Sequence, residues 1–193
     1  MVNQKQGQIS STLSLVIVAM CIALGLVLPF LTGQIHEIGN MLCPMHIPVL
    51  IAGFLLEIKY AAAVGFITPL LRSLIFGMPA MYPGAISMAF ELTALAVTAG
   101  LMHKLLRTAF YGKIQGKKKH YTVLYVSLII AIVVSRVVYG IVRFAMLGII
   151  GTNFNLAMWF TVEFVNAWPG ILLQLLIIPP LVRRLQIICT KNC

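Results

Sequence analysis

Six ionisable side chains fall within or beside long apolar stretches of the chain, where a charged group is costly and marks a functional site by default. They are His46, Arg72, Glu91, Arg136, Arg143 and Glu163. Three arginines against two carboxylates leave a surplus of positive charge inside the apolar segments. This set predicts a binding site for a small molecule, and it favours an anionic ligand.

Helical spacing predicts that these groups converge. Arg136, Tyr139 and Arg143 follow one another at steps of three and four residues, which places them on one face of a helix. The same spacing gives a second face, made of Glu163, Asn166, Gly170 and Gln174. Asn153 and Trp168 add polar groups and an aromatic wall at the same level. A mostly apolar lining with a few placed polar groups is typical of a small-molecule site.

A purely structural role stays open for these residues. Glu91 either contacts a ligand or pairs with Arg72 or Arg136 to hold helices together. The depth of Arg136 favours such a pair, whereas Arg72 and Arg143 are open to both roles. His46 stands between two prolines, so it either anchors the start of its helix or contacts the ligand.

The elements that must position these groups are six apolar segments of helical length. They cover residues 13–30, 41–56, 61–76, 85–102, 122–147 and 159–182. A helix needs about 20 apolar residues to cross a bilayer, so this chain of 193 residues has room for six crossings and little else. We therefore predict an all-α integral membrane protein, with one bundle of six transmembrane helices covering residues 1–193.

The basic residues outside these segments predict the orientation. With the N-terminus in the cytoplasm, the inside segments hold eleven lysines and arginines and the three outside loops hold none. The eleven are Lys5, Lys59, Lys104, Arg107, Lys113, Lys117, Lys118, Lys119, Arg183, Arg184 and Lys191. The positive-inside rule therefore places both termini in the cytoplasm. Nearly all of the buried polar groups then lie in the outward half of the bundle, which predicts a cup that opens to the outside.

Composition excludes several other classes of protein. Hydrophobic residues make up 61% of the chain and charged residues 9%, whereas a soluble domain carries about a quarter charged residues. The net charge of +10 sits in short connectors and in the tail, so it indicates membrane topology and not the binding of nucleic acid. The four cysteines form no CxxC pair, and no metal or cofactor is expected. Without an HExxH motif, histidines paired at helical spacing or any aspartate, an intramembrane enzyme is disfavoured.

Two segments, MLCPMHIPVLIAGFLL and GFITPLLRSLIFGMPAMYPGAISMAFELTA, resemble the substrate-binding (S) component of energy-coupling-factor (ECF) vitamin transporters. The resemblance is to the branch that includes the riboflavin, folate and pantothenate binders. It is carried by PMHIPV, PLLRS, GMP and MAFEL within residues 41–95, and the six-segment layout with inside termini matches the remainder. The turn Glu57-Ile58-Lys59 departs from the glycine-containing turn expected there, on the inner side and away from the pocket.

The resemblance implies a transport subunit in a bacterial cell membrane. Such a component binds a vitamin or its precursor from outside, hydrolyses nothing, and docks on a transmembrane scaffold subunit that is coupled to two ATPases. Docking in the family uses small residues of the first helix in an alanine-x-x-x-alanine pattern, which Ala19 and Ala23 match. The loop at residues 31–40 and the loop between the last two segments would act as lids.

The residues expected to bind substrate are His46, Arg72, Glu91, Arg143, Asn153, Glu163, Asn166 and Trp168. Because the arginine surplus favours a carboxylate, pantothenate is the first choice of ligand. Pyridoxine, folate, riboflavin and a queuosine precursor are the alternatives. An autonomous small-molecule carrier is the competing function, and the apolar inner half and the lack of an inverted repeat count against it.

Overall fold

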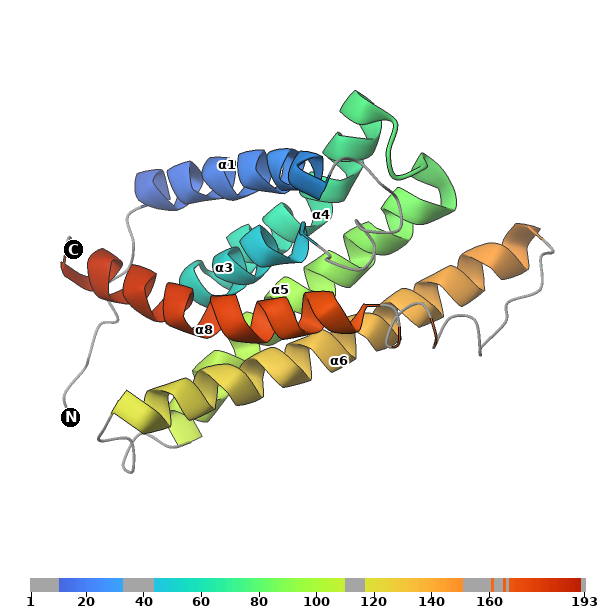
Figure 1. The fold of residues 1–193 in the computed structure, drawn as a ribbon. Coiled ribbons are helices and arrows are strands. Elements are labelled where there is room, and N and C mark those ends of the chain that lie inside the picture. The colour runs from blue at the N-terminus through green and yellow to red at the C-terminus, as the bar shows by residue number, and fades with distance from the viewer. Residues whose placement is uncertain are drawn as a thin grey trace.

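The computed structural model describes residues 11–32, 44–109, 117–150, 161, 165 and 167–191, and every element in these ranges is helical. Helix α1 (Ser11–Val27) continues into the 3-10 turn η1 (Leu28–Thr32). A short helix α3 (His46–Leu55) is followed at once by α4 (Ile58–Phe76). The π-turn η2 (Met81–Ala85) leads into α5 (Ile86–Ala109), and α6 (Lys117–Ile150) and α8 (Trp168–Lys191) follow (Figure 1).

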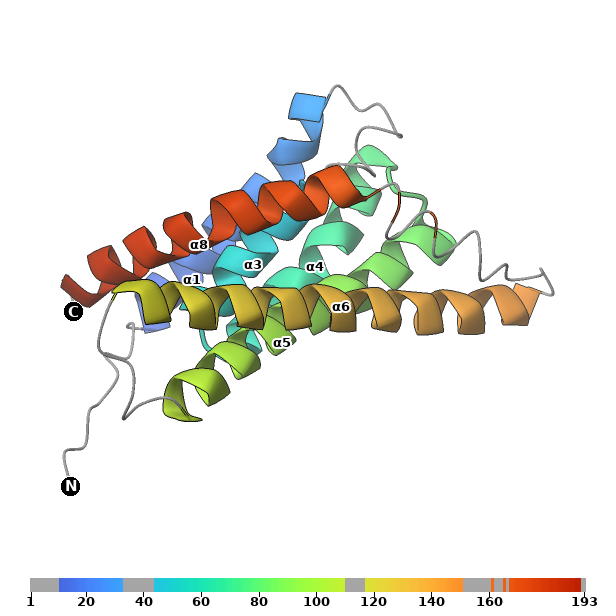
Figure 2. The same cartoon turned by 60° about the horizontal axis from the view of Figure 1, so that its bottom comes forward.

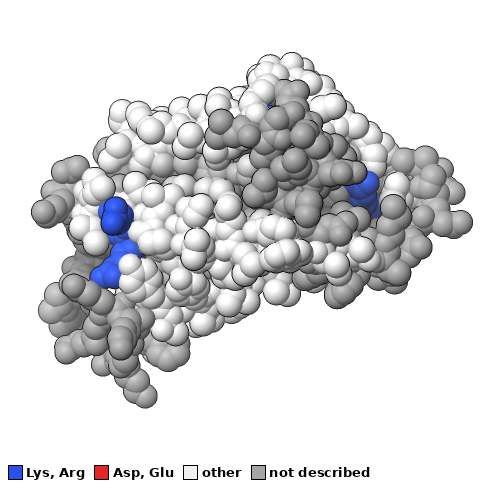
Figure 3. All heavy atoms as spheres, in the orientation of Figure 1, with Lys and Arg blue, Asp and Glu red and all other residues white. Residues whose placement is uncertain are grey.

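Successive helices run in opposite directions along one bundle (Figures 1 and 2). The start of α1 and the end of α8 lie at the same end of this bundle, on the left in Figure 1, together with the α3–α4 turn, the end of α5 and the start of α6. We call it the basic end, because Lys104, Arg107, Arg183 and Arg184 lie toward the ends of α5 and α8. Figure 3 shows blue side chains here and no red ones on the described part of this face.

Five of the described helices are long and apolar enough to cross a membrane: Ser11–Phe30, Ile58–Phe76, Met81–Ala109, His120–Gly148 and Trp168–Ile188. The predicted all-α integral membrane fold is therefore confirmed. The predicted crossing at residues 41–56 contains the ten-residue α3, which at 1.5 Å per residue covers about half of the ~30 Å hydrocarbon core. The orientation across the membrane stays a prediction.

Several helix boundaries differ from the predicted ones. Helix α8 has Pro169 in its first turn, where the missing N–H would be unpaired in any case. The predicted start of the last segment, at residue 159, lies outside the described residues. Helix α8 ends at Lys191, beyond the predicted end at residue 182. Helices α5 and α6 extend into the predicted basic connector, because lysine and arginine are good helix formers.

Close crossings at glycines make α5 the helix against which its neighbours pack. A Cβ atom on Gly65 of α4 would lie 2.6 Å from the carbonyl oxygen of Leu92, and one on Gly100 of α5 would lie 2.7 Å from that of Gly53. No side chain fits at such distances. Fully buried leucines fill the space around these crossings, among them Leu50, Leu95, Leu124 and Leu128. The position of Glu91 on α5 is fixed by this packing.

The connection from α4 to α5 is held by local hydrogen bonds. Helix α4 ends at Gly77, whose φ of 69° is left-handed and favours glycine. The Ser73 hydroxyl donates to the carbonyl of Pro79 at 2.7 Å. The Tyr82 hydroxyl then donates to the carbonyl of Met146 at 2.9 Å, which ties this connection to the far part of α6.

Candidate functional site

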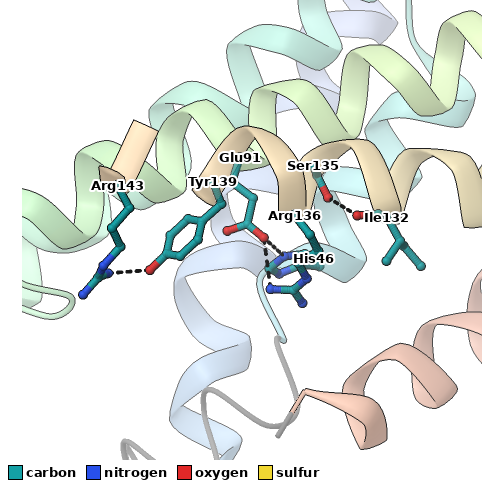
Figure 4. A network of polar contacts seen from close by, with 7 residues as sticks. All are labelled: His46, Glu91, Ile132, Ser135, Arg136, Tyr139 and Arg143. Atoms are coloured by element: carbon teal, nitrogen blue, oxygen red, sulfur yellow. Dashed lines mark hydrogen bonds and ion pairs between the residues drawn. The ribbon is translucent and has the colours of Figure 1, made fainter. Parts of the chain in front are cut away.

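One carboxylate joins three helices at the centre of the candidate site. Glu91 of α5 accepts from the Nε2 of His46 on α3 at 3.2 Å and forms an ion pair with the Nη1 of Arg136 on α6 at 3.1 Å (Figure 4). Both contacts use the same oxygen, Oε1. We call these three residues the Glu91 network.

The Glu91 network is shielded from the surroundings. His46, Glu91 and Arg136 are exposed by 3%, 2% and 4%. A buried ion requires a partner of opposite charge, because desolvation costs on the order of several kcal/mol per ion. Here the carboxylate of Glu91 and the guanidinium of Arg136 are that partner for each other. The Nδ1 of His46 has no hydrogen-bond partner among the described residues. The Nδ1 atom of His46 therefore stays available to a further group.

The polar face continues along α6 from Arg136. The guanidinium of Arg143 donates to the Tyr139 hydroxyl and lies over the Tyr139 ring, 5.6 Å from its centroid. Figure 4 shows these two side chains on the same stretch of helix as Arg136, as the three-and-four spacing predicted. No carboxylate among the described residues pairs with Arg143.

Arg72 lies apart from the Glu91 network. Its Nη1 donates to the carbonyl oxygen of Leu26 on α1 at 2.8 Å, and its guanidinium lies 5.3 Å from the ring centroid of Phe30 and 5.7 Å from that of Phe76. Of the two predicted pairings for Glu91, the one with Arg136 is present and the one with Arg72 is absent from the described contacts. The guanidinium of Arg72 instead joins α4 to the end of α1.

Trp168 begins α8 and is 57% exposed. The remaining predicted site residues, Asn153, Glu163 and Asn166, lie outside the described residues. Gln174 lies four residues after Gly170 on α8 and is fully buried. Neither polar atom of its amide has a hydrogen-bond partner among the described residues. Its place on the predicted polar face of the last helix was the signal for it, although it was not among the residues expected to bind substrate.

The polar groups of the candidate site are of the kind that can hold a small molecule. No described group of three His, Cys, Asp or Glu residues could hold a metal ion. Within the described ranges, the Nδ1 of His46 and the amide of Gln174 have no hydrogen-bond partner, and no carboxylate pairs with Arg143. A few placed polar groups in mostly apolar surroundings are typical of a small-molecule site.

Comparison with curated proteins and with solved structures finds no significant match. A family model described as "ECF transporter, substrate-specific component" matches residues 13–182, which is most of the chain. This protein therefore belongs to the substrate-specific components of ECF transporters.

Proposed function

We propose that this protein captures a water-soluble vitamin or related micronutrient at the outer face of a bacterial cell membrane and delivers it through an ECF-type importer. Substrate-specific components are substrate-binding transport subunits and not enzymes, so the ligand would be released unchanged. The observation that supports this site is the buried Glu91 network together with the polar face of α6 that continues it.

The charges around the site favour a ligand with an anionic group. The guanidinium of Arg136 is already compensated by Glu91, whereas Arg143 has no carboxylate partner among the described residues. A ligand carboxylate at Arg143 would supply that partner and gain a charge-assisted hydrogen bond. Pantothenate, which carries a carboxylate, is therefore our first choice, and pyridoxine, folate, riboflavin and a queuosine precursor are the compounds to test beside it.

We assign the predicted residues to different parts of this site. His46, Glu91 and Arg143 would line its floor and wall, and Trp168 would stand at its mouth. Arg72, which is engaged by Leu26 and two phenylalanine rings, would position α1 and not contact the ligand. Of the residues outside the described ranges, Asn153, Glu163 and Asn166 are retained as ligand contacts.

Docking on a transmembrane scaffold subunit, itself coupled to two ATPases, would use the outer face of α1. Ala19 and Ala23 are exposed on this helix, while Cys21 and Gly25 on the opposite side are buried against the bundle. Small residues four positions apart allow another helix to approach closely. The exposed pair thus offers a partner helix a flat contact surface.

A ligand titration tests the binding function. The purified chain would be titrated with each vitamin while its tryptophan fluorescence is recorded, since Trp168 stands at the proposed mouth. We expect one saturating response, which Arg143→Ala weakens at least about tenfold because a charged hydrogen bond is lost. Arg184→Ala, at the basic end, is the matched control and should bind like the wild type.

Three outcomes would contradict the proposal. Absence of any response, confirmed by calorimetry on folded protein, would remove the binding function. An equal loss of affinity in Arg143→Ala and Arg184→Ala would place the ligand elsewhere. Uptake into liposomes that contain this chain alone would identify an autonomous carrier in place of an importer subunit.

A further inference from the structure

A second polar cluster lies at the basic end, far along the helices from the Glu91 network. It joins the last turns of α5, the first turn of α6 and the second half of α8. His103 and Arg107 come from α5, His120 from α6, and Arg183 from α8. We call these four residues the basic-end cluster. The ligand-binding function proposed above does not use it.

Ring packing and hydrogen bonds hold the cluster together around His103. The ring of His103 packs edge-on against the rings of Phe54, at 5.6 Å, and of His120, at 6.1 Å between centroids. The Nε2 atom of Gln186 lies 3.5 Å from the Nε2 of His103 and donates to the carbonyl of Phe54 at 3.3 Å. Four helices therefore meet at this imidazole.

The Nδ1 atom of His103 has no hydrogen-bond partner among the residues that the structure describes. His103 is 7% exposed. A buried polar atom without a partner costs about 1–3 kcal/mol. Such an atom is satisfied when a ligand or a water molecule reaches it.

The charges in the cluster are all positive. Arg107 and Arg183 both act electrostatically on His120, and Arg107 also acts on His103. Arg183 is held in place over the ring of Tyr121, 4.6 Å from its centroid. Within the described ranges no carboxylate pairs with either arginine. The two arginines disfavour a metal cation at the histidines and favour an anion.

The surface beside the cluster is aliphatic. Leu105 on α5 is 57% exposed, and Leu172 and Leu176, which precede Arg183 on its own face of α8, are 54% and 76% exposed. Exposed aliphatic side chains in a membrane protein face acyl chains, so the cluster borders the headgroup layer on one side and the hydrocarbon on the other. An acidic protein segment would match the charges but not this aliphatic border.

We propose that the basic-end cluster binds the phosphate of an anionic phospholipid, whose acyl chains lie along Leu105, Leu172 and Leu176. Basic pockets between transmembrane helices are suited to such headgroups. The two arginines would pair with the phosphate oxygens, and a histidine N–H would donate to them. The bound lipid would join α5, α6 and α8 at the end opposite the Glu91 network.

Lipid retention measured by native mass spectrometry tests this proposal on the full chain. The protein would be exchanged into micelles that contain phosphatidylglycerol and phosphatidylcholine with identical acyl chains. We expect the wild type to retain phosphatidylglycerol preferentially, and Arg107→Gln and Arg183→Gln each to reduce this preference about fivefold. Arg184→Gln, whose side chain is exposed and outside the cluster, is the matched control and should keep the preference.

Several results would overturn the proposal. Equal retention of the two lipids by the wild type would do so without any variant, and hence independently of whether the variants fold. An equal effect of Arg184→Gln would show a diffuse attraction of charges. Displacement of the lipid by inorganic phosphate at constant ionic strength would indicate a site for the free ion. Displacement of the lipid by a soluble acidic peptide such as oligoglutamate would indicate a surface that docks an acidic protein segment.

Discussion

The Oε1 atom of Glu91 on α5 lies 3.1 Å from the Nη1 atom of Arg136 on α6, and both side chains are almost completely buried. These two helices share the most extensive interface in the described bundle. The ion pair therefore lies inside the main packing contact of the fold, and His46 extends it to a third helix. A site built on this pair has its polar groups fixed before any ligand arrives.

Removal of the central carboxylate should destabilise the protein strongly. In Glu91→Gln, Arg136 becomes a buried cation without its counter-charge, which costs about 3–5 kcal/mol. We expect a large drop in the midpoint of thermal unfolding in detergent. Glu57→Gln is the matched control, since Glu57 is a half-exposed carboxylate that pairs with Lys59 at the surface.

The double variant Glu91→Gln with Arg136→Met separates charge from packing. It removes both ions, so much of the lost stability should return. If Glu91→Gln alone unfolds at the same temperature as Glu57→Gln, the pair contributes nothing to the fold.

The sequence predicted the membrane fold and the polar face of α6 because both depend on local patterns. Apolar runs of about 20 residues identify the crossings, and steps of three and four residues place Arg136 and Arg143 on one side. The family resemblance seen in the segments around His46 and Glu91 is confirmed by the family match. The branch of the family and the ligand stay predictions.

The partners of the buried charges could not be read from the sequence. Glu91 had two candidate arginines, and the choice between them depends on how α4, α5 and α6 pack in three dimensions. Close approach at Gly65 fixes α4 against α5, and in this arrangement Arg72 reaches Leu26 and not Glu91.

A single added methyl group at Gly65 should destabilise the crossing of α4 and α5. The new Cβ atom would lie 2.6 Å from the carbonyl oxygen of Leu92, which belongs to a helical backbone and cannot turn away. Overpacking of this kind costs about 1–3 kcal/mol. Thermal unfolding of Gly65→Ala, compared with Gly148→Ala on α6, is the measurement.

Gly148 provides the control because a Cβ atom there would meet nothing within 4 Å. Gly148→Ala should be neutral or slightly stabilising, since alanine loses less conformational freedom in a helix. Equal unfolding midpoints for the two variants would show that α4 and α5 can move apart without loss.

Arg72 should contribute to stability more than to ligand affinity. In Arg72→Ala the carbonyl of Leu26 loses its charged donor and the contacts with Phe30 and Phe76 disappear, which costs about 1.5–3 kcal/mol. The stability of Arg72→Lys, which keeps a charge but not the planar group, should lie between that of the wild type and that of Arg72→Ala. Unfolding midpoints and vitamin affinities would be measured on the same preparations. If Arg72→Ala keeps its stability but loses vitamin binding, Arg72 contacts the ligand and does not position α1.

Enlarging the exposed alanines of α1 should block assembly with the scaffold subunit while leaving vitamin binding intact. Ala19→Leu and Ala23→Leu add bulk to a face that the bundle does not cover, so the fold should tolerate them. A close contact with a helix of the scaffold subunit would not tolerate the added bulk. Ala145→Leu, at an exposed alanine of α6, is the matched control. The measurement is the amount of scaffold subunit that copurifies with each variant, beside its vitamin affinity. Normal copurification of the Ala19→Leu, Ala23→Leu double variant would move the docking surface to another helix, and a loss in Ala145→Leu of the same size would show that added bulk acts without regard to position.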